Sequence, residues 1–123
     1  MPRVRFLPVE QNHAMNQSYA TVAPSRAEVD ALPGLTLVEF GTDWCGFCKA
    51  AQPLISEALT GAPPLRHLKI EDGSGRPLGR SFKVKLWPTL IFMREGKELA
   101  RLVRPESAAA IRRELEQAAS AGV

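Results

Sequence analysis

Cysteine is scarce in this sequence: among 123 residues, only Cys45 and Cys48 are cysteines. Two cysteines cannot build the framework of several disulfides that holds many small secreted domains together. They also supply only half of a tetrahedral zinc site, and the two histidines, His13 and His67, lack the spacing of paired zinc ligands. A chain of this length can bury a hydrophobic core as one domain without such devices.

Long hydrophobic runs and runs of one charge are also lacking. No apolar segment approaches the roughly 18 residues of a membrane-spanning helix. In residues 1–18 the few apolar side chains are interrupted by Arg5, Pro8 and Glu10, so we expect no signal peptide. The 16 Lys and Arg residues exceed the 13 Asp and Glu residues, but they are scattered singly or in pairs. We therefore expect a solvated surface, with neither a nucleic acid nor a membrane as partner.

The spacing of the two cysteines favours chemistry over structural support. A disulfide across two intervening residues closes a very small loop and removes little entropy from the unfolded chain. Without an export signal we expect the protein to be cytoplasmic, where a C-x-x-C pair is more often catalytic or metal-binding than structural. The pair Cys45 and Cys48 is therefore predicted to be a redox centre, and a metal site shared between molecules is the alternative.

Hydrophobic periodicity predicts a single α/β domain. Residues 1–24 have neither helical nor strand periodicity, and we interpret them as a flexible N-terminal arm before a domain over residues 25–123. Predicted helices cover residues 25–32, 47–61, 78–82 and 105–118, and predicted strands cover residues 35–40, 65–70, 89–93 and 98–103. The helix between the first two strands makes those strands parallel, and the last two strands form a hairpin.

The predicted helix after the first strand gives the two thiols different roles. Cys45 lies at the N-terminus of this helix, where unpaired N–H groups and the helix dipole stabilise a thiolate. Cys48 lies one turn further in, where it is shielded, as suits a thiol that attacks only after a mixed disulfide has formed. Position therefore predicts a nucleophile and a resolving thiol.

Glu39 is a carboxylate in an otherwise apolar strand, six residues before Cys45. One interpretation is a glutamate at the end of a strand that reaches water. The other is a buried acid beside the dithiol, with its pKa raised by desolvation, that exchanges a proton with Cys48. We favour the buried acid because of its distance along the chain from the cysteines.

Several separated motifs resemble those of the thioredoxin family over residues 25–119. The segment VEFGTDWCGFCK resembles the family's strand and dithiol, and Pro53 falls where the family has a helix-kinking proline. The segments WPTLIF and REGKE resemble its cis-proline strand and its hairpin. The resemblance implies a thioredoxin fold, with a central mixed sheet of four to five strands flanked by helices. It also implies that Cys45 is the nucleophile, Cys48 the resolving thiol, Glu39 the buried acid and Pro88 the cis-proline.

The resemblance further implies a substrate-binding surface around the dithiol. Its residues would be Trp44, Gly46, Phe47, Trp87, Pro88 and Arg104. The sequence departs from the family's pattern here: Phe47 replaces a proline, Trp87 a smaller residue and Arg104 a glycine. Glu39 replaces the usual aspartate, and His67 aligns with a lysine that supports this acid. We expect these changes to alter the redox potential and the fit of substrates.

The predicted function is that of a thiol-disulfide oxidoreductase that reduces protein disulfides through Cys45 and Cys48. The expected partners are disulfide-containing proteins and an unidentified recycling reductase, with no metal and no organic cofactor, and we expect a monomer. Two alternatives stay open. One is an oxidase or isomerase of the same fold, which Phe47 allows, and the other is a non-enzymatic binding module that uses the same surface.

Overall fold

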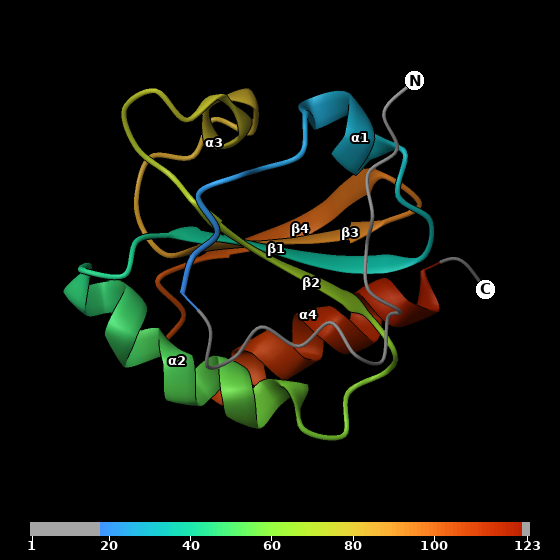
Figure 1. Ribbon diagram of the computed structural model, residues 1–123. Coiled ribbons are helices and arrows are strands. Elements are labelled where there is room, and N and C mark those ends of the chain that lie inside the picture. Colours follow the sequence, from blue (N-terminus) through green and yellow to red (C-terminus); the bar gives the residue numbers. More distant parts are fainter. Residues whose placement is uncertain (1–17, 122–123) are drawn as a thin grey trace.

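A four-stranded mixed sheet with helices on both faces forms the part of the chain that the computed structural model describes, residues 18–121 (Figure 1). The elements in chain order are α1 (Arg26–Asp30), β1 (Leu35–Gly41), α2 (Gly46–Leu59), β2 (Arg66–Glu71), α3 (Pro77–Ser81), β3 (Thr89–Arg94), β4 (Lys97–Val103) and α4 (Ala108–Ser120). The strand order is β2-β1-β3-β4, with β1 parallel to β2 and antiparallel to β3. The predicted α/β class, the parallel pair and the final hairpin are confirmed.

Strand β1 lies inside the sheet, and its side chains alternate between two hydrophobic cores. Helices α2 and α4 cover one face of the sheet, and α1 and α3 cover the other (Figure 1). Leu35 and Leu37 contact the core beneath α2 and α4, whereas Val38 and Phe40 contact the core beneath α1 and α3. Because side chains of a strand alternate with a period of two, Glu39 points to the same face as Leu37. The strand thus directs this carboxylate toward α2.

Serine caps fix where two of the helices begin. Ser25 and Glu28 form a reciprocal capping box at α1, as predicted. Helix α4 begins later than the predicted residue 105, because the Ser107 side chain accepts a hydrogen bond from the Ala110 N–H at 3.1 Å. A serine that caps a helix is more favourable than a first turn opened by Pro105 without such a side-chain bond.

The segment before α1 packs against the domain, unlike the flexible arm that the sequence predicted up to residue 24. Tyr19 is only 4% exposed. Ala20 extends the edge of β2: its N–H donates to the Lys69 carbonyl at 2.8 Å, and its carbonyl accepts from the Glu71 N–H at 2.9 Å. One anchored side chain and one bridge give no periodic signal, so the pattern could not reveal them. Residues 1–17 of the predicted arm lie outside the described residues.

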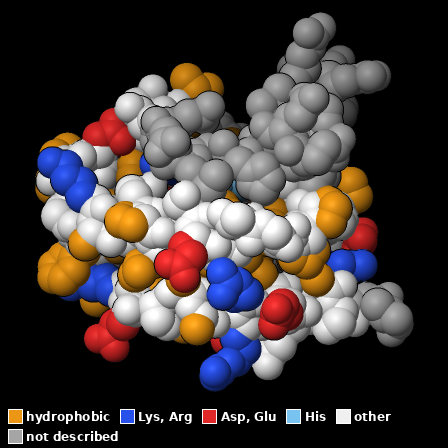
Figure 2. Space-filling model, turned by 90° about the horizontal axis from the view of Figure 1, so that it is seen from below, with side chains coloured by type: hydrophobic (Ala, Val, Ile, Leu, Met, Phe, Trp, Pro, Cys, Tyr) orange, Lys and Arg blue, Asp and Glu red, His pale blue; other side chains and the backbone are white. Residues whose placement is uncertain are grey.

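The surface carries charges of both signs. On the face seen from below in Figure 2, basic and acidic side chains alternate with apolar ones and form no single-sign stripe. Among the described residues, no helix is long and apolar enough to cross a membrane.

Candidate active site

The two cysteines lie where β1 gives way to α2. Cys45 is the N-cap of α2, and its Sγ accepts a hydrogen bond from the Cys48 N–H at 3.2 Å. Both are free thiols; Cys45 is 8% exposed and Cys48 only 1%. A sulfur that receives a backbone N–H at a helix N-terminus is well placed to carry negative charge. The outer position of Cys45 and the inner position of Cys48 are the ones that their predicted roles require.

Cys48 is strongly disfavoured as a thiolate. Burial raises the pKa of its thiol to about 12, and the hydrogen bond with Cys45 acts in the same direction. At neutral pH Cys48 therefore holds its proton, and it can attack another sulfur only if a base removes that proton.

Glu39 is fully buried and held by three donors from three parts of the chain. Its Oε1 lies 2.9 Å from His67 Nε2, and its Oε2 accepts hydrogen bonds from the Tyr19 hydroxyl and, at 3.0 Å, from Gln52 Nε2. Burial alone would raise the pKa of Glu39, but the hydrogen bond and charge of His67, with the bonds from Tyr19 and Gln52, lower it. The expectation of a raised pKa is therefore wrong, because the pattern of one strand does not reveal the donors brought by other elements. Glu39 is a buried carboxylate that can accept a proton.

Tyr19 completes this site, and sequence reasoning missed it. Its hydroxyl donates to Glu39 Oε2, and its side chain packs in one buried cluster with Cys45 and Cys48. Gly41 makes this approach possible, because a Cβ there would lie 2.6 Å from Cys48 Sγ and 2.8 Å from the Tyr19 hydroxyl oxygen. A lone glycine at the end of an apolar strand was the available signal, since it often marks a close approach of another group.

Aromatic and cationic side chains surround the outer side of the dithiol. Trp87 packs against the buried cluster of Tyr19, Cys45 and Cys48, and its ring meets that of Trp44 edge-on at 5.7 Å between centroids. The Trp87–Pro88 peptide bond is cis.

Arg104 links the substrate-side residues that the resemblance implied. Its guanidinium lies 3.8 Å from the centroid of the Phe47 ring, and its Nε donates to the Trp87 carbonyl at 2.8 Å. Trp44 and Phe47 are exposed, at 72% and 57%. Gly46 begins α2, and a Cβ there would meet nothing within 4 Å. The surface is thus apolar, with one cation above it.

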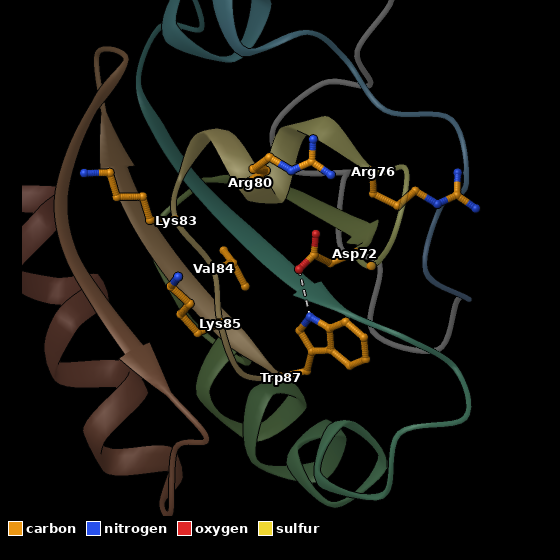
Figure 3. A pocket seen from close by; sticks show the side chains of 8 residues that line it. Asp72, Arg76, Arg80, Lys83, Val84, Lys85 and Trp87 are labelled. Carbon is orange, nitrogen blue, oxygen red and sulfur yellow. Dashed lines mark hydrogen bonds between the residues drawn. The ribbon is translucent and has the colours of Figure 1, made fainter.

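A surface pocket of about 500 Å³ lies on the other side of Trp87 (Figure 3). Asp72 forms its inner wall and accepts a hydrogen bond from Trp87 Nε1 at 2.8 Å. Four basic residues also line it: Arg76, Arg80, Lys83 and Lys85. Their side chains diverge and do not converge on one point (Figure 3), so they do not form a focused anion site. The contact in this pocket that bears on the dithiol is the bond by which Asp72 holds the Trp87 ring. Among residues 18–121, no group of three or more His, Cys, Asp or Glu side chains could hold a metal ion.

Comparison with known proteins identifies the arrangement. A family model described as Thioredoxin matches residues 16–117. The thioredoxin of Chlamydia trachomatis is 38% identical over 71 residues, which cover 57% of this chain and 69% of that protein. The thioredoxin of Mycobacterium tuberculosis is 36% identical over 80 residues, covering 64% and 69%.

A solved structure extends the match over most of the fold. Thioredoxin 2 from Pseudomonas aeruginosa PAO1, in its reduced form, is 55% identical, with a TM-score of 0.77, and the match covers 87% of this chain and 99% of that one. The family match spans more than half of the chain and includes both cysteines. The protein therefore belongs to the thioredoxin family and is a thiol-disulfide oxidoreductase that reduces protein disulfides.

Proposed function

We propose that Cys45 attacks the disulfide of a protein substrate and that Cys48 resolves the mixed disulfide. The observation that carries this assignment is the contrast between the two sulfurs: Cys45 Sγ accepts the Cys48 N–H, whereas Cys48 is buried with a raised pKa. In the first step a bond forms between Cys45 Sγ and one substrate sulfur, and the substrate disulfide breaks. The other substrate sulfur leaves with the electron pair and takes up a proton.

The second step needs the proton of Cys48 to leave. Cys48 then attacks Cys45 Sγ, the Cys45–Cys48 disulfide forms, and the second substrate sulfur leaves as a thiolate and is protonated. The substrate gains two electrons, and the dithiol loses them. We assign the role of base to Glu39, because it is an ionised carboxylate held in the same buried site.

Substrates would bind over the exposed apolar surface around the dithiol. An extended substrate segment would lie against Trp87 and Pro88 in a strand-like pairing, which gives affinity with little sequence preference. Trp44, Gly46 and Phe47 would border it, and Arg104 would contact it from the end of β4. The predicted partners are disulfide-containing proteins and a recycling reductase that reduces the Cys45–Cys48 disulfide to two thiols again. The proposed working form is a cytoplasmic monomer.

Turnover of a protein disulfide tests the assignment of the nucleophile. We expect the protein, supplied with a thiol reductant, to reduce insulin, and we expect Cys45→Ser to abolish turnover. A Cys48→Ser variant should instead accumulate a mixed disulfide with the substrate, which mass spectrometry detects. Turnover unchanged by Cys45→Ser would refute the assignment.

The role of Glu39 is tested by separating the two steps. Because Glu39 would act only on Cys48, Glu39→Gln should slow the release of the mixed disulfide more than its formation. Stopped-flow measurements on a substrate with a chromophoric leaving thiol follow the two steps separately. Equal slowing of both steps, or of neither, would count against Glu39 as the base.

The direction of exchange is tested by the reduction potential. Phe47 lies between the cysteines with an Arg104 cation over its ring, which distinguishes this dithiol from the family's usual pattern. Equilibration with a glutathione couple should give a value nearer the roughly −270 mV of a reducing thioredoxin than the roughly −120 mV of a strong oxidant. A value at the oxidising end would instead favour the oxidase alternative.

A further inference from the structure

The Tyr19 hydroxyl lies between the buried acid and the buried thiol. It donates a hydrogen bond to Glu39 Oε2. It also lies in one buried cluster with Cys48, and a Cβ at Gly41 would lie 2.8 Å from the hydroxyl oxygen and 2.6 Å from Cys48 Sγ. A hydroxyl has one proton to donate and two lone pairs that accept. Its proton points to the carboxylate and one lone pair accepts from Gln52 Nε2 at 3.4 Å, so the second lone pair is left to accept the proton of the Cys48 thiol. The three groups therefore form a directed chain from Cys48 through Tyr19 to Glu39.

Glu39 meets its hydrogen-bonding partners on both oxygens. His67 occupies Oε1, and Gln52 shares Oε2 with Tyr19. Tyr19 is the partner that packs in one buried cluster with the Cys48 side chain, whereas Gln52 Nε2 donates to the Cys48 carbonyl at 2.9 Å and to the Tyr19 hydroxyl at 3.4 Å. A hydroxyl can accept and donate in one event, but an amide N–H₂ group cannot accept. Among these neighbours Tyr19 is thus the group suited to pass the proton on.

Gly41 shows that the close approach of Tyr19 and Cys48 is built into the fold. Cys48 Sγ and the Tyr19 hydroxyl both come within 3 Å of the point where a Cβ of residue 41 would stand. Tyr19 is itself fixed at its backbone, because its N–H donates to Asp43 Oδ1 at 2.9 Å. Tyr19 is therefore held at both ends, by Asp43 at its backbone and by Glu39 at its hydroxyl.

We propose that Tyr19 transfers the proton from Cys48 to Glu39 during resolution of the mixed disulfide; this inference rests on the function proposed above. The Cys48 S–H bond breaks as its proton moves to the Tyr19 oxygen, and the original Tyr19 proton moves to Glu39 Oε2. Cys48 becomes a thiolate, Tyr19 regains a neutral hydroxyl and Glu39 becomes a carboxylic acid. The Cys48 thiolate then attacks Cys45. When the recycling reductase later reduces the Cys45–Cys48 disulfide, Glu39 returns the proton through Tyr19 to Cys48.

A solvent path beside this chain predicts how a variant would behave. A cavity of about 70 Å³ is bordered by Tyr19, Cys48, Gln52 and Lys69, and it is large enough for water. Without the Tyr19 hydroxyl, Cys48 would lose its proton to solvent hydroxide through this cavity. Resolution would then accelerate as the pH rises, whereas transfer to ionised Glu39 is independent of pH above the carboxylate's own titration.

The test is Tyr19→Phe, which removes only the hydroxyl. We expect resolution of the mixed disulfide at pH 7 to slow by roughly 10²-fold, the usual scale of one general acid-base contribution. Formation of the mixed disulfide should stay within about twofold, since that step leaves Cys48 unchanged. Resolution in the variant should increase with pH between 6 and 9, and in the unchanged protein it should not. A rate and pH profile equal to those of the unchanged protein would overturn the proposal.

A double-variant cycle separates transfer from mere packing. If Tyr19 and Glu39 act in one chain, Tyr19→Phe combined with Glu39→Gln should be no slower than the slower single variant. Multiplying effects would mean that the two residues act independently, which contradicts the chain. Failure of the underlying function would look different, because no mixed disulfide would then form in the unchanged protein.

A fluorine label reports on the surroundings of Tyr19 while its hydroxyl stays in place. Tyr19 is the only tyrosine in the sequence, so biosynthetic incorporation of 3-fluorotyrosine labels this position alone. We expect its fluorine resonance to shift on Glu39→Gln and on Cys48→Ser. A resonance that responds to neither change would contradict the contacts on which the proposal depends.

Discussion

Glu39 ties the stability of the domain to pH. Three donors lower its pKa in the folded protein, while in the unfolded chain the pKa returns to an ordinary value of about 4.3. A carboxylate with a depressed folded-state pKa adds stability above its unfolded pKa, and this stability is lost as the pH falls through the folded value. The groups that face it are Tyr19, Gln52 and His67.

Glu39→Gln should therefore destabilise the protein in a pH-dependent way. At pH 7 we expect a loss of about 1–3 kcal/mol in the free energy of unfolding, because hydrogen bonds to a buried charge become neutral ones. The loss should shrink as the pH falls below about 4.3, where the carboxyl group of the unfolded chain takes up a proton, and it should level off below the lower pKa of the folded state. Urea unfolding at a series of pH values measures it. Glu116→Gln, on the exposed side of α4, is the matched control and should change little at any pH. A difference that grows as the pH falls would contradict the depressed pKa.

Cys45 has a structural role that can be separated from its chemistry. As N-cap of α2, its sulfur accepts the Cys48 N–H, and a serine hydroxyl can do the same. Both Cys45→Ser and Cys45→Ala should lack disulfide turnover, but only the alanine variant loses the cap. We expect it to be about 1 kcal/mol less stable than the serine variant in thermal or urea unfolding. Equal stabilities would show that the N-cap bond contributes nothing measurable.

The dithiol could be predicted from local pattern, but its buried surroundings could not. Cys45 and Cys48 are close together in the sequence, and hydrophobic periodicity predicts that a helix begins at them, directly after a strand. Tyr19 reaches the same site from 20 residues before Glu39, with no repeat or spacing that marks it. The resemblance aligned His67 with a lysine that supports the buried acid. Its contact with Glu39, however, depends on the register in which β2 pairs with β1. Residues brought together by strand register are beyond the reach of a single sequence without structure.

The hairpin of β3 and β4 shows an element whose turn is fixed by its neighbours. The sequence predicted a turn containing Gly96, and the structure places a turn there with positive φ at Glu95 and Gly96. What the sequence could not indicate is that this turn packs on the end of α1. A Cβ at Gly96 would lie 1.8 Å from the Asp30 carbonyl oxygen. Two elements far apart in the chain therefore constrain one residue.

Gly96→Ala and Gly34→Ala make a matched pair that separates backbone strain from steric overlap. Both glycines have positive φ, at 78° and 73°, so each alanine has a left-handed penalty of about 1–2 kcal/mol. A Cβ at Gly34 meets nothing within 4 Å, whereas at Gly96 it overlaps Asp30. We expect Gly96→Ala to be less stable by a further 1–3 kcal/mol or so, the typical cost of overpacking. Chemical unfolding compares the two, and equal losses would mean that the hairpin yields freely to the overlap.

Hydrophobic periodicity predicts which segments are helical but not at which residue each helix begins. The pattern placed α2 and its N-terminus correctly because apolar residues recur along one face, and Pro53 lies inside the helix as expected. It placed the start of α4 too early, because only the side-chain bond from Ser107 decides which turn is the first. Caps depend on one hydrogen bond, so they are the least certain part of a pattern-based prediction.

The folded domain begins before the first helix. The sheet would end at β2 on one side, but Ala20 pairs with this edge, and Tyr19 fills the space left by Gly41. Covering an edge strand removes unpaired backbone groups that could bind another chain. Residues 19 and 20 thus contribute to the sheet and to the core near the dithiol, and they bring the Tyr19 hydroxyl to Glu39.

Two truncations test this view of the whole domain. One begins at Ser25, the boundary predicted from periodicity, and the other begins at Ser18. The shorter chain loses the buried Tyr19 ring and the two backbone hydrogen bonds of Ala20. Because removal of a buried aromatic side chain costs about 3–5 kcal/mol, we expect the chain that begins at Ser25 to be less stable than the other by at least that amount. Urea unfolding of the two reduced proteins measures the difference. Equal stability would mean that the folded domain begins at residue 25. It would also contradict the packing of Tyr19 on which its proposed role in catalysis depends.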